Sequence, residues 1–376
     1  MTNYIPRYGS EVRLSSIINF PRGKSRFEGL NSNGAYYFNS ATEAIAFLLL
    51  NLGLKPKSTV GLPLYVCSSV PQAIKVAKHN PKFLDIILDN SGYSIDFSKL
   101  SGIDVLIFVH YFGVSYQKID AIRAAYPNIL IIEDCSHISH KEYVPSKFSD
   151  AAVFSFNLHK PISCGVGGCL VINRHQNIAG IIENYNNLPA HGWRDDWRMA
   201  CIFFLKSCAH SELFQKISRK YLENRRRVRS RNNPYQDIVP HRLASFSGSI
   251  LGNQYFLSME RDMELNYLRI PKELRLQLKI DAVKQLIYFP LFLPSKQLRD
   301  KLNEKLHKIG VDSFILWENC FFNADFYSKD YSDCINTKIM LDKILYLPVK
   351  LLVDNRNFLK FQNVLGFLNK FVLDEF

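Results

Sequence analysis

The stretch that decides the fold is Phe-Ser-Phe-Asn-Leu-His-Lys-Pro at residues 154–161, followed by Gly-Val-Gly-Gly at residues 165–168. Lys160 comes directly after an apolar, strand-like segment, and the glycines behind it permit a tight backbone turn. Upstream, the apolar run at residues 129–132 ends in Glu133 and Asp134. This pairing of a lysine with an acid suits a pyridoxal phosphate (PLP) enzyme. The amine forms a Schiff base with the cofactor aldehyde, and the carboxylate holds a proton on the pyridine nitrogen.

Composition describes a globular protein that is too long for one simple core. The 376 residues are 47% hydrophobic and 22% charged, which is ordinary for such a protein. We expect residues 1–245 to form a large PLP-binding domain and residues 246–376 a smaller C-terminal α/β domain. No apolar run reaches the roughly 18 to 20 residues of a membrane span, and residues 1–7 lack a secretory pattern. The eight cysteines form no CxxC pair, which favours reduced thiols and a cytoplasmic protein.

The net charge of +13 is unevenly distributed, because residues 225–231 carry five arginines in seven positions. A solvated helix face or loop is one interpretation of this cluster. A surface for an anionic partner, such as a nucleotide diphosphate, a membrane or a second subunit, is another. No nucleic-acid motif or interleaved aromatic residues accompany the arginines, so nucleic acid is not an expected partner.

Short apolar segments alternate with helical patterns through the first half of the chain. Strands are expected at residues 35–39, 59–64, 82–87, 104–109, 129–133, 151–156 and 169–173, with helices at 42–54, 68–79 and 117–126. Strands that are apolar on both faces and separated by helices indicate a mostly parallel sheet covered by helices on both sides. Residues 176–280 are expected to be mainly helical. Strand-like segments return at residues 287–292 and 345–348, with helices at 298–309 and 355–371, and indicate the second, smaller α/β layer.

Small and hydroxyl-bearing residues join the first strand to its helix. Asn-Ser-Ala-Thr-Glu-Ala occupies residues 39–44, and such a helix start offers N–H and O–H groups to an anion. An ordinary helix cap by Ser40 or Thr42 is the alternative interpretation. Ser155 supplies another hydroxyl five residues before Lys160.

Together these segments resemble the DegT/DnrJ/EryC1/StrS family of PLP-dependent sugar aminotransferases, which have the aspartate aminotransferase-like fold (PLP fold type I). The family's S-G-T-x-A-L phosphate turn is matched by Ser-Ala-Thr-Glu-Ala-Ile at residues 40–45. Its V-H-x-x-G strand end is matched at residues 109–113 and its E-D-A-A-Q segment at residues 133–137. Its lysine segment and G-E-G-G turn are matched at residues 154–168. The order and spacing agree over about residues 35 to 175, and the likeness is thinner beyond them.

The resemblance implies a role for each matched position. Lys160 would be the Schiff-base lysine and proton shuttle, Asp134 the partner of the pyridine nitrogen, and His137 the contact to the ring oxygen. The phosphate would be held by Ser40, Ala41, Thr42 and Ser155. The family stacks a flat group on the pyridine from the segment that is here Leu-Tyr-Val-Cys at residues 64–67. Tyr65 is the aromatic residue of that segment, although the usual position aligns with Cys67.

Several positions depart from the family pattern. Ala41 replaces a glycine, Val166 a glutamate and His137 a glutamine. The asparagine–arginine segment that reaches into the neighbouring subunit is not recognisable, and residues 193–199 are its candidate remnant. These departures leave PLP as the expected cofactor. They affect the expectation of the family's standard nucleotide-sugar substrate.

The resemblance implies an aminotransferase that moves an amino group, with glutamate as the expected donor, to a keto sugar. A nucleotide-linked sugar, used for surface polysaccharide or a secondary metabolite, is the expected kind of substrate. It also implies a homodimer, because the neighbour would complete the phosphate site. One alternative is a sugar dehydratase of the same family, in which histidine replaces the lysine, since His159 adjoins Lys160.

Two further alternatives come from other classes of protein. A non-catalytic binding or regulatory protein could use the same fold together with the arginine cluster, but it would need neither Lys160 nor Asp134. A metal site could use Asp134, His137 and His140, which are spaced by three residues. No fourth ligand accompanies these three, so no metal is expected.

Overall fold

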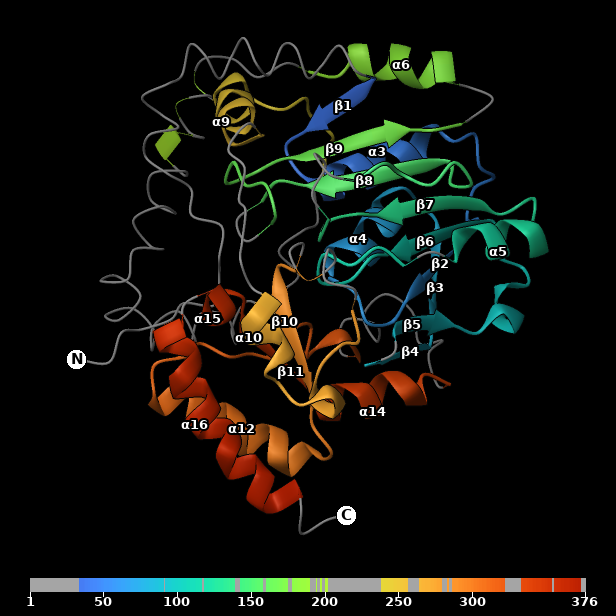
Figure 1. The fold of residues 1–376 in the computed structure, drawn as a ribbon. Helices are drawn as coiled ribbons and strands as arrows, with labels where there is room; N and C mark the ends of the chain where they lie inside the picture. The colour runs from blue at the N-terminus through green and yellow to red at the C-terminus, as the bar shows by residue number, and fades with distance from the viewer. Residues whose placement is uncertain are drawn as a thin grey trace.

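The central sheet has seven strands in the order β1-β9-β8-β7-β6-β2-β3 (Figure 1). The computed structural model describes residues 34–90, 92–116, 118–138, 143–157, 160–174, 178–189, 194, 197, 200–201, 238–255, 264–278, 283, 286–321, 333–353 and 355–372. The strands of the sheet are β1 (Ala35–Phe38), β2 (Thr59–Pro63), β3 (Asn80–Leu84), β6 (Val105–Val109), β7 (Leu130–Asp134), β8 (Ala151–Ser155) and β9 (Gly168–Ile172).

The helices of the first half are α3 (Ala41–Asn51), α4 (Ser69–Val76), α5 (Ile119–Ala125), α6 (Ile178–Asn186) and a 3₁₀ turn, η1 (Phe97–Leu100). Helix α3 packs against α4, α6, β8 and β9. All five residues of β6 and of β8 are buried, as expected for strands covered on both faces. The predicted α/β class is therefore confirmed.

Strand direction brings the ends of distant segments to one edge of the sheet. Strands β2, β3, β6, β7 and β8 run parallel, whereas β9 is antiparallel to both β8 and β1. The carboxyl ends of β1, β2, β6, β7 and β8 therefore lie at the same edge, and β9 begins there. Ligands of open α/β sheets bind outside the carboxyl ends of the strands, so this edge is where a site is expected.

The strand expected at residues 82–87 is interrupted at Asp85. Strand β3 ends at Leu84, and β4 (Ile86–Asp89) pairs instead with β5 (Gly92–Ile95) in a separate hairpin. The Asp85 carboxylate accepts hydrogen bonds from the N–H groups of Ile86, Asn336 and Thr337, at 2.8–2.9 Å. Asn336 and Thr337 begin helix α14 (Ile335–Lys343). Asp85 therefore turns the chain out of the sheet because it caps a helix that lies far away in sequence.

The C-terminal part forms the expected second α/β layer. Strands β10 (Tyr288–Phe292) and β11 (Ile344–Pro348) pair antiparallel, and α12 (Lys296–Lys308) packs against α14, α16 (Asn355–Val372) and β11 (Figure 1). The remaining elements are α9 (Ser245–Tyr255), α10 (Glu264–Leu268), η2 (Lys272–Leu274) and α15 (Lys350–Val353). One continuous cluster of buried apolar residues runs from the sheet into this layer. The division at residue 245 remains a prediction.

The sequence also raised the questions of a membrane span and of the arginine-rich segment. Among the described helices, none has the length and apolar character needed to cross a membrane. The arginine cluster at residues 225–231 lies outside the described residues, as does most of the segment at residues 193–199.

Candidate active site

A cavity of about 930 Å³ opens at the carboxyl edge of the sheet. Its lining includes most of the residues singled out from the sequence, namely Ser40, Ala41, Thr42, Asp134, His137, Ser155 and Lys160. They come from the starts or ends of α3, β7 and β8 and from the segments that follow the two strands. The sheet topology thus brings three separate stretches of sequence to one place.

Lys160 lies beyond the end of β8 and is partly buried. Its backbone N–H donates to the carbonyl of Asn157 (3.3 Å), and Asn157 in turn forms a bridge with Gly165. Burial lowers the pKa of the Lys160 amine, and the nearby Cys67 and Asp134 oppose that shift. A lowered pKa increases the fraction of the amine that is neutral and nucleophilic at a given pH, as a Schiff-base lysine requires.

Asp134 ends β7 and is 5% exposed. One of its carboxylate oxygens accepts the N–H of Ser136 at 2.9 Å. The residue pairs with Val109 of β6 and Val153 of β8, so the parallel ladder on both sides fixes its backbone. A buried carboxylate held in this way can fix a proton on a basic ring nitrogen that enters the cavity.

His137 forms a stacked pair with Trp317, an aromatic residue that sequence reasoning did not assign to the site. The ring centroids lie 5.3 Å apart with an interplanar angle of 16°. His137 Nδ1 accepts the N–H of Phe112 at 3.3 Å, which assigns the ring proton to Nε2. Burial, reinforced by the charge of Lys160, lowers the pKa of His137 well below its usual value. His137 is therefore a neutral hydrogen-bond donor.

Trp317 reaches the cavity from a turn of the C-terminal part. Its φ of 51° is unusual for a bulky residue. The turn is fixed on both sides, by the Cys320 N–H to the Trp317 carbonyl (2.9 Å) and by reciprocal hydrogen bonds between Phe314 and Tyr346. No local pattern in the sequence predicts this placement, because it depends on packing between the two parts of the chain.

The proposed phosphate turn combines a helix cap with a close backbone approach. Ser40 is the N-cap of α3, so the capping interpretation holds for this residue. A Cβ atom built on Gly168 would lie 2.3 Å from the backbone nitrogen of Ala41. Only glycine therefore allows β9 to pass so near the turn. The hydroxyl-bearing residues Thr42 and Ser155 line the same cavity, and this set of donors suits a phosphate group.

The structure places Tyr65 away from the cavity lining and Cys67 in it. Tyr65 is fully buried, and its hydroxyl lies 2.6 Å from the hydroxyl of Tyr346. Its ring packs edge-on against Trp317, with a centroid distance of 4.9 Å. Tyr65 is thus part of the aromatic cluster behind the site. The buried position of Tyr65 does not support its expected stacking on a cofactor ring, and Cys67 is the residue of that segment that lines the cavity.

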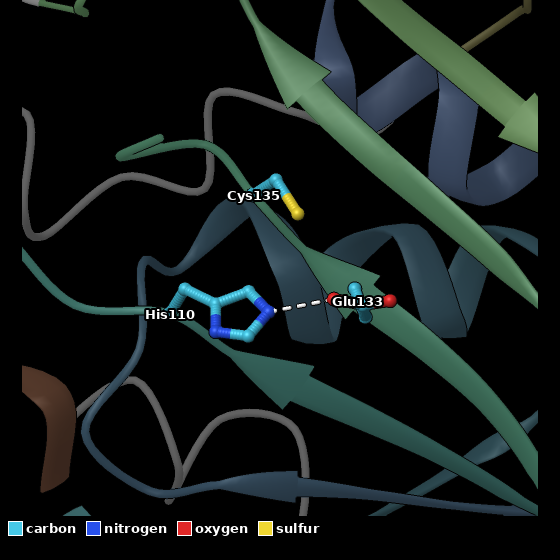
Figure 2. A group of neighbouring side chains, drawn as sticks. All are labelled: His110, Glu133 and Cys135. Carbon is cyan, nitrogen blue, oxygen red and sulfur yellow. Dashed lines mark hydrogen bonds and ion pairs between the residues drawn. The ribbon is translucent and has the colours of Figure 1, made fainter. Parts of the chain in front are cut away.

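Three buried side chains beside the cavity, His110, Glu133 and Cys135, could in principle hold a metal ion, since their ligand atoms lie within 4.8 Å of one another (Figure 2). His110 Nδ1 accepts the N–H of Tyr116 at 3.3 Å, so the proton belongs on Nε2, which donates to Glu133 at 2.8 Å. The proton on His110 Nε2 therefore occupies the position at which a metal ion would have to bind this nitrogen. Burial, with the charges of Glu133 and Asp134, raises the pKa of the Cys135 thiol well above its usual value. The trio therefore lacks two of the deprotonated ligands that a metal requires.

The remaining contacts of Glu133 complete a hydrogen-bonded network. Its carboxylate also accepts from the hydroxyls of Tyr143 and Ser149 and from the N–H of Ser146 (2.8 Å). Burial opposes ionisation of Glu133, but the hydrogen bonds from His110, Ser149 and Tyr143 outweigh it and lower the pKa of Glu133. The network stabilises the end of β7, from which Asp134 projects. Of the metal set considered from the sequence, Asp134 and His137 line the cavity, and His140 lies outside the described residues. His159, on which the dehydratase alternative depends, also lies outside them.

Comparison with known proteins finds a matching family model and several curated relatives. Residues 26–200 match the model of the DegT/DnrJ/EryC1/StrS aminotransferase family. A UDP-4-amino-4,6-dideoxy-N-acetyl-beta-L-altrosamine transaminase of Campylobacter jejuni strain 81-176 is 33% identical over 170 residues, 42% of this chain and 43% of that protein. The enzyme of the same name from strain NCTC 11168 is 29% identical over 171 residues, with the same coverage. The match thus spans less than half the length of these relatives.

Solved structures extend the likeness to almost the whole chain at the level of the fold. Helicobacter pylori PseC, an aminotransferase involved in pseudoaminic acid biosynthesis, superposes with a TM-score of 0.64 at 16% identity, covering 98% of both chains. Bacillus subtilis NtdA with bound cofactor PMP gives 0.66 at 16% identity, covering 98% of this chain and 87% of the other. The predicted type I fold of PLP enzymes is confirmed. The match to the model of the DegT/DnrJ/EryC1/StrS aminotransferase family covers residues 26–200, a little under half of the chain.

Proposed function

We propose that the chain is a PLP-dependent aminotransferase that transfers an amino group to a keto sugar. One observation carries the proposal: Lys160 and Asp134 line a single cavity together with the hydroxyl-bearing residues Ser40, Thr42 and Ser155. When bound, PLP supplies an aldehyde that captures amines and a ring that accepts electrons from the substrate carbon. The match of residues 26–200 to the model of an aminotransferase family supports this assignment.

Each polar group then has a task that follows from its surroundings. The Lys160 amine, whose pKa is lowered by burial, would hold the cofactor and would carry the proton to and from the substrate carbon. Asp134 holds the proton on the pyridine nitrogen. His137 is neutral with its proton on Nε2, and it would donate a hydrogen bond to the ring oxygen as a glutamine amide would. Trp317 keeps the imidazole plane fixed by stacking on it.

The names of the relatives support the kind of substrate that we propose. The Campylobacter jejuni proteins are named for a UDP-linked amino sugar, and we propose a nucleotide-linked keto sugar as the amino acceptor, with glutamate as donor. The cavity of about 930 Å³ lies near the upper end of the volumes typical of small-molecule sites, so it has room for more than a cofactor. A cytoplasmic homodimer is the form that we propose for the active enzyme.

Chemical trapping tests the assignment directly. Borohydride reduction of the PLP-loaded protein, followed by peptide mass mapping, should place the pyridoxyl group on Lys160. Lys160→Arg should remain unlabelled, while Lys147→Arg, a change outside the cavity lining, should label like the wild type. A label on another lysine, or none on a protein shown to hold PLP, would contradict the assignment.

Turnover then identifies the substrates. The absorbance of the loaded protein near 400 nm should bleach on addition of L-glutamate. A panel of keto sugars, each with and without a nucleotide, should restore it for the true acceptor. Failure of every amino donor to bleach a correctly loaded protein would favour a non-catalytic role.

A further inference from the structure

Glu43 is an acid in the first turn of α3, beside the turn proposed to hold the cofactor phosphate, and it lines the same cavity. Its backbone N–H donates to Ser40 Oγ at 3.1 Å. In return the Ser40 hydroxyl donates to Glu43 Oε1 at 3.3 Å. This reciprocal arrangement is a capping box, in which the N-cap serine and the acid three residues later satisfy one another.

The second carboxylate oxygen of Glu43 is fixed by a segment from the other half of the chain. Glu43 Oε2 accepts the backbone N–H of His241 at 2.9 Å. That segment is itself anchored on β1, since the Leu243 N–H donates to the Tyr37 carbonyl (3.0 Å) and Arg242 forms a bridge with Phe38. Glu43 is thus held at both oxygens, and its carboxylate cannot swing away without losing two partners.

This geometry conflicts with a bound phosphate in two ways. The only proton of the Ser40 hydroxyl already points at Glu43, so it is not available to a phosphate oxygen. A phosphate oxygen bonded to Ser40 Oγ at the usual ~2.7 Å would also lie no more than about 6 Å from Glu43 Oε1. A carboxylate and a phosphate dianion at that separation repel one another.

We infer that Glu43 takes up one proton from solvent when the cofactor phosphate binds, and that this proton frees the Ser40 hydroxyl to donate to the phosphate. Protonated at Oε1, Glu43 donates to Ser40 Oγ, which has lone pairs for this proton and for the Glu43 N–H. The Ser40 O–H bond then turns toward the phosphate. Oε2 keeps its bond from His241. No covalent bond other than O–H changes, and the charge of the site rises by one. The inference rests on the proposed function.

The groups around Glu43 support this direction. Burial raises the pKa of Glu43, opposed by the His241 backbone hydrogen bond, by the charge of His241 and by Ser40. His241 is the titratable side chain facing Glu43 from the segment that begins at residue 238. The residues that α4, β8 and the turn before β9 contribute to the cavity, among them Ser69, Ser155 and Gly167, carry no charge. Lys160, Asp134, His110, His137 and Cys67 line the same cavity as more distant titratable groups.

The test compares the binding of PLP with that of pyridoxal, which lacks the phosphate. Both present the same aldehyde and ring to Lys160, so the ratio of their dissociation constants cancels the titration of the amine. Between about pH 7 and 9 the phosphate is a dianion throughout. The preference for PLP over pyridoxal should fall with rising pH in the wild type, by up to about tenfold per pH unit once Glu43 is ionised in the empty site.

Glu43→Gln is the matched variant. Its amide can donate to Ser40 Oγ and accept from His241, so it keeps the capping box and imitates protonated Glu43. Its preference for PLP should be high and independent of pH over this range. In His241→Asn the backbone N–H remains, and the pH dependence should persist. Calorimetry in buffers of different ionisation enthalpy should show proton uptake for PLP in the wild type and less in Glu43→Gln.

The outcomes separate this inference from the proposed function. If neither PLP nor pyridoxal binds in any variant, the proposed function fails. If PLP binds to Lys160 but its preference over pyridoxal does not change with pH, only the role of Glu43 is overturned. A pH dependence that survives in Glu43→Gln and disappears in His241→Asn would show that His241 takes up the proton. That result would also overturn the role of Glu43.

Discussion

At the scale of single residues, two side chains carry most of the proposed chemistry, and burial lowers the pKa of one of them, Lys160. The side chains of Lys160 and Asp134 reach one cavity from segments that follow neighbouring parallel strands. Neither is needed to build the sheet. Their roles can therefore be probed by substitutions that leave the fold in place.

Asp134→Asn should fold normally and lose nearly all amino transfer. The amide oxygen can still accept the Ser136 N–H, so the end of β7 keeps its hydrogen bond. A neutral amide cannot hold the pyridinium proton, and losing one charge-assisted hydrogen bond costs about 1.5–3 kcal/mol in binding. We expect a larger loss in kcat/KM, with an unchanged urea midpoint as the control for folding. Wild-type turnover in this variant would remove Asp134 from the mechanism.

The buried amine of Lys160 should leave a signature in the stability of the cofactor-free protein. Burial lowers its pKa in the folded state, whereas the unfolded chain titrates near ~10.4. Between these two values the unfolded state binds more protons, so the free energy of unfolding should rise as pH increases through that window. Lys160→Met should be more stable than the wild type at neutral pH and should lack this part of the rise. Urea unfolding at a series of pH values measures both effects, and parallel curves for the two proteins would contradict the expectation.

At the scale of secondary-structure elements, close packing between β9 and the start of α3 shapes the proposed phosphate turn. Ser40 forms a bridge with Gly167, and Gly168 touches the backbone of Ala41. Such contact between two backbones leaves no flexible side chain that could move aside. The glycines of the Gly-Val-Gly-Gly segment therefore have a packing role in addition to their role in the turn.

Gly168→Ala should destabilise the protein by roughly 1–3 kcal/mol through overpacking, and it should weaken PLP binding more than pyridoxal binding. Gly366→Ala is the matched control, because it makes the same change within α16, where a new Cβ meets nothing within 4 Å. That variant should be stabilised by about 0.5–1 kcal/mol, as expected for a glycine replaced inside a helix. Denaturant unfolding of the two variants side by side makes the comparison, and equal effects would argue against a tight contact at Gly168.

Local patterns explain why much of the fold and part of the site were predictable from sequence. The strands are short and apolar on both faces, and the lysine, acid and hydroxyl residues follow strand ends at fixed spacings. The contacts that sequence reasoning missed join positions far apart in the chain. Asp85 caps a helix that begins about 250 residues later, and Glu43 meets a backbone N–H 198 residues away. Tyr65 was chosen as the local aromatic residue, but its hydroxyl meets that of Tyr346 and its ring packs against Trp317. No window of sequence contains both partners.

At the scale of the whole molecule, the two parts of the chain share one apolar core and one wall of the cavity. Asp85 ties the sheet to α14, and Trp317 brings the C-terminal part to His137. The lining of the cavity nevertheless offers few hydroxyl groups for a phosphate, whose three oxygens each accept more than one hydrogen bond. A second copy related by two-fold symmetry is the commonest way to complete such a site.

The active protein is expected to be at least a homodimer. Light scattering at low micromolar concentration should give about twice the monomer mass, and PLP occupancy should fall as dilution separates the subunits. Arg194 belongs to the segment at residues 193–199 and is one of its described residues. If this segment reaches the neighbouring subunit, Arg194→Ala should reduce the affinity for cofactor or substrate. A monomer with full cofactor and full activity would overturn the dimer.

The aromatic cluster of Tyr65, Tyr111, Trp317 and Tyr346 has a consequence for how such a protein can diversify. Its members come from both parts of the chain. Tyr65 and Tyr111 lie tilted against one another, and each packs edge-on against Trp317. The hydroxyls of Tyr65 and Tyr346 are paired in the interior. In a chimeric protein that joins residues 1–245 to the C-terminal part of a relative, the aromatic rings from the two parts would not fit one another in this cluster. Recombination should therefore succeed only when both sides of the cluster are inherited together, which makes these four residues, rather than the boundary in the sequence, the unit of exchange.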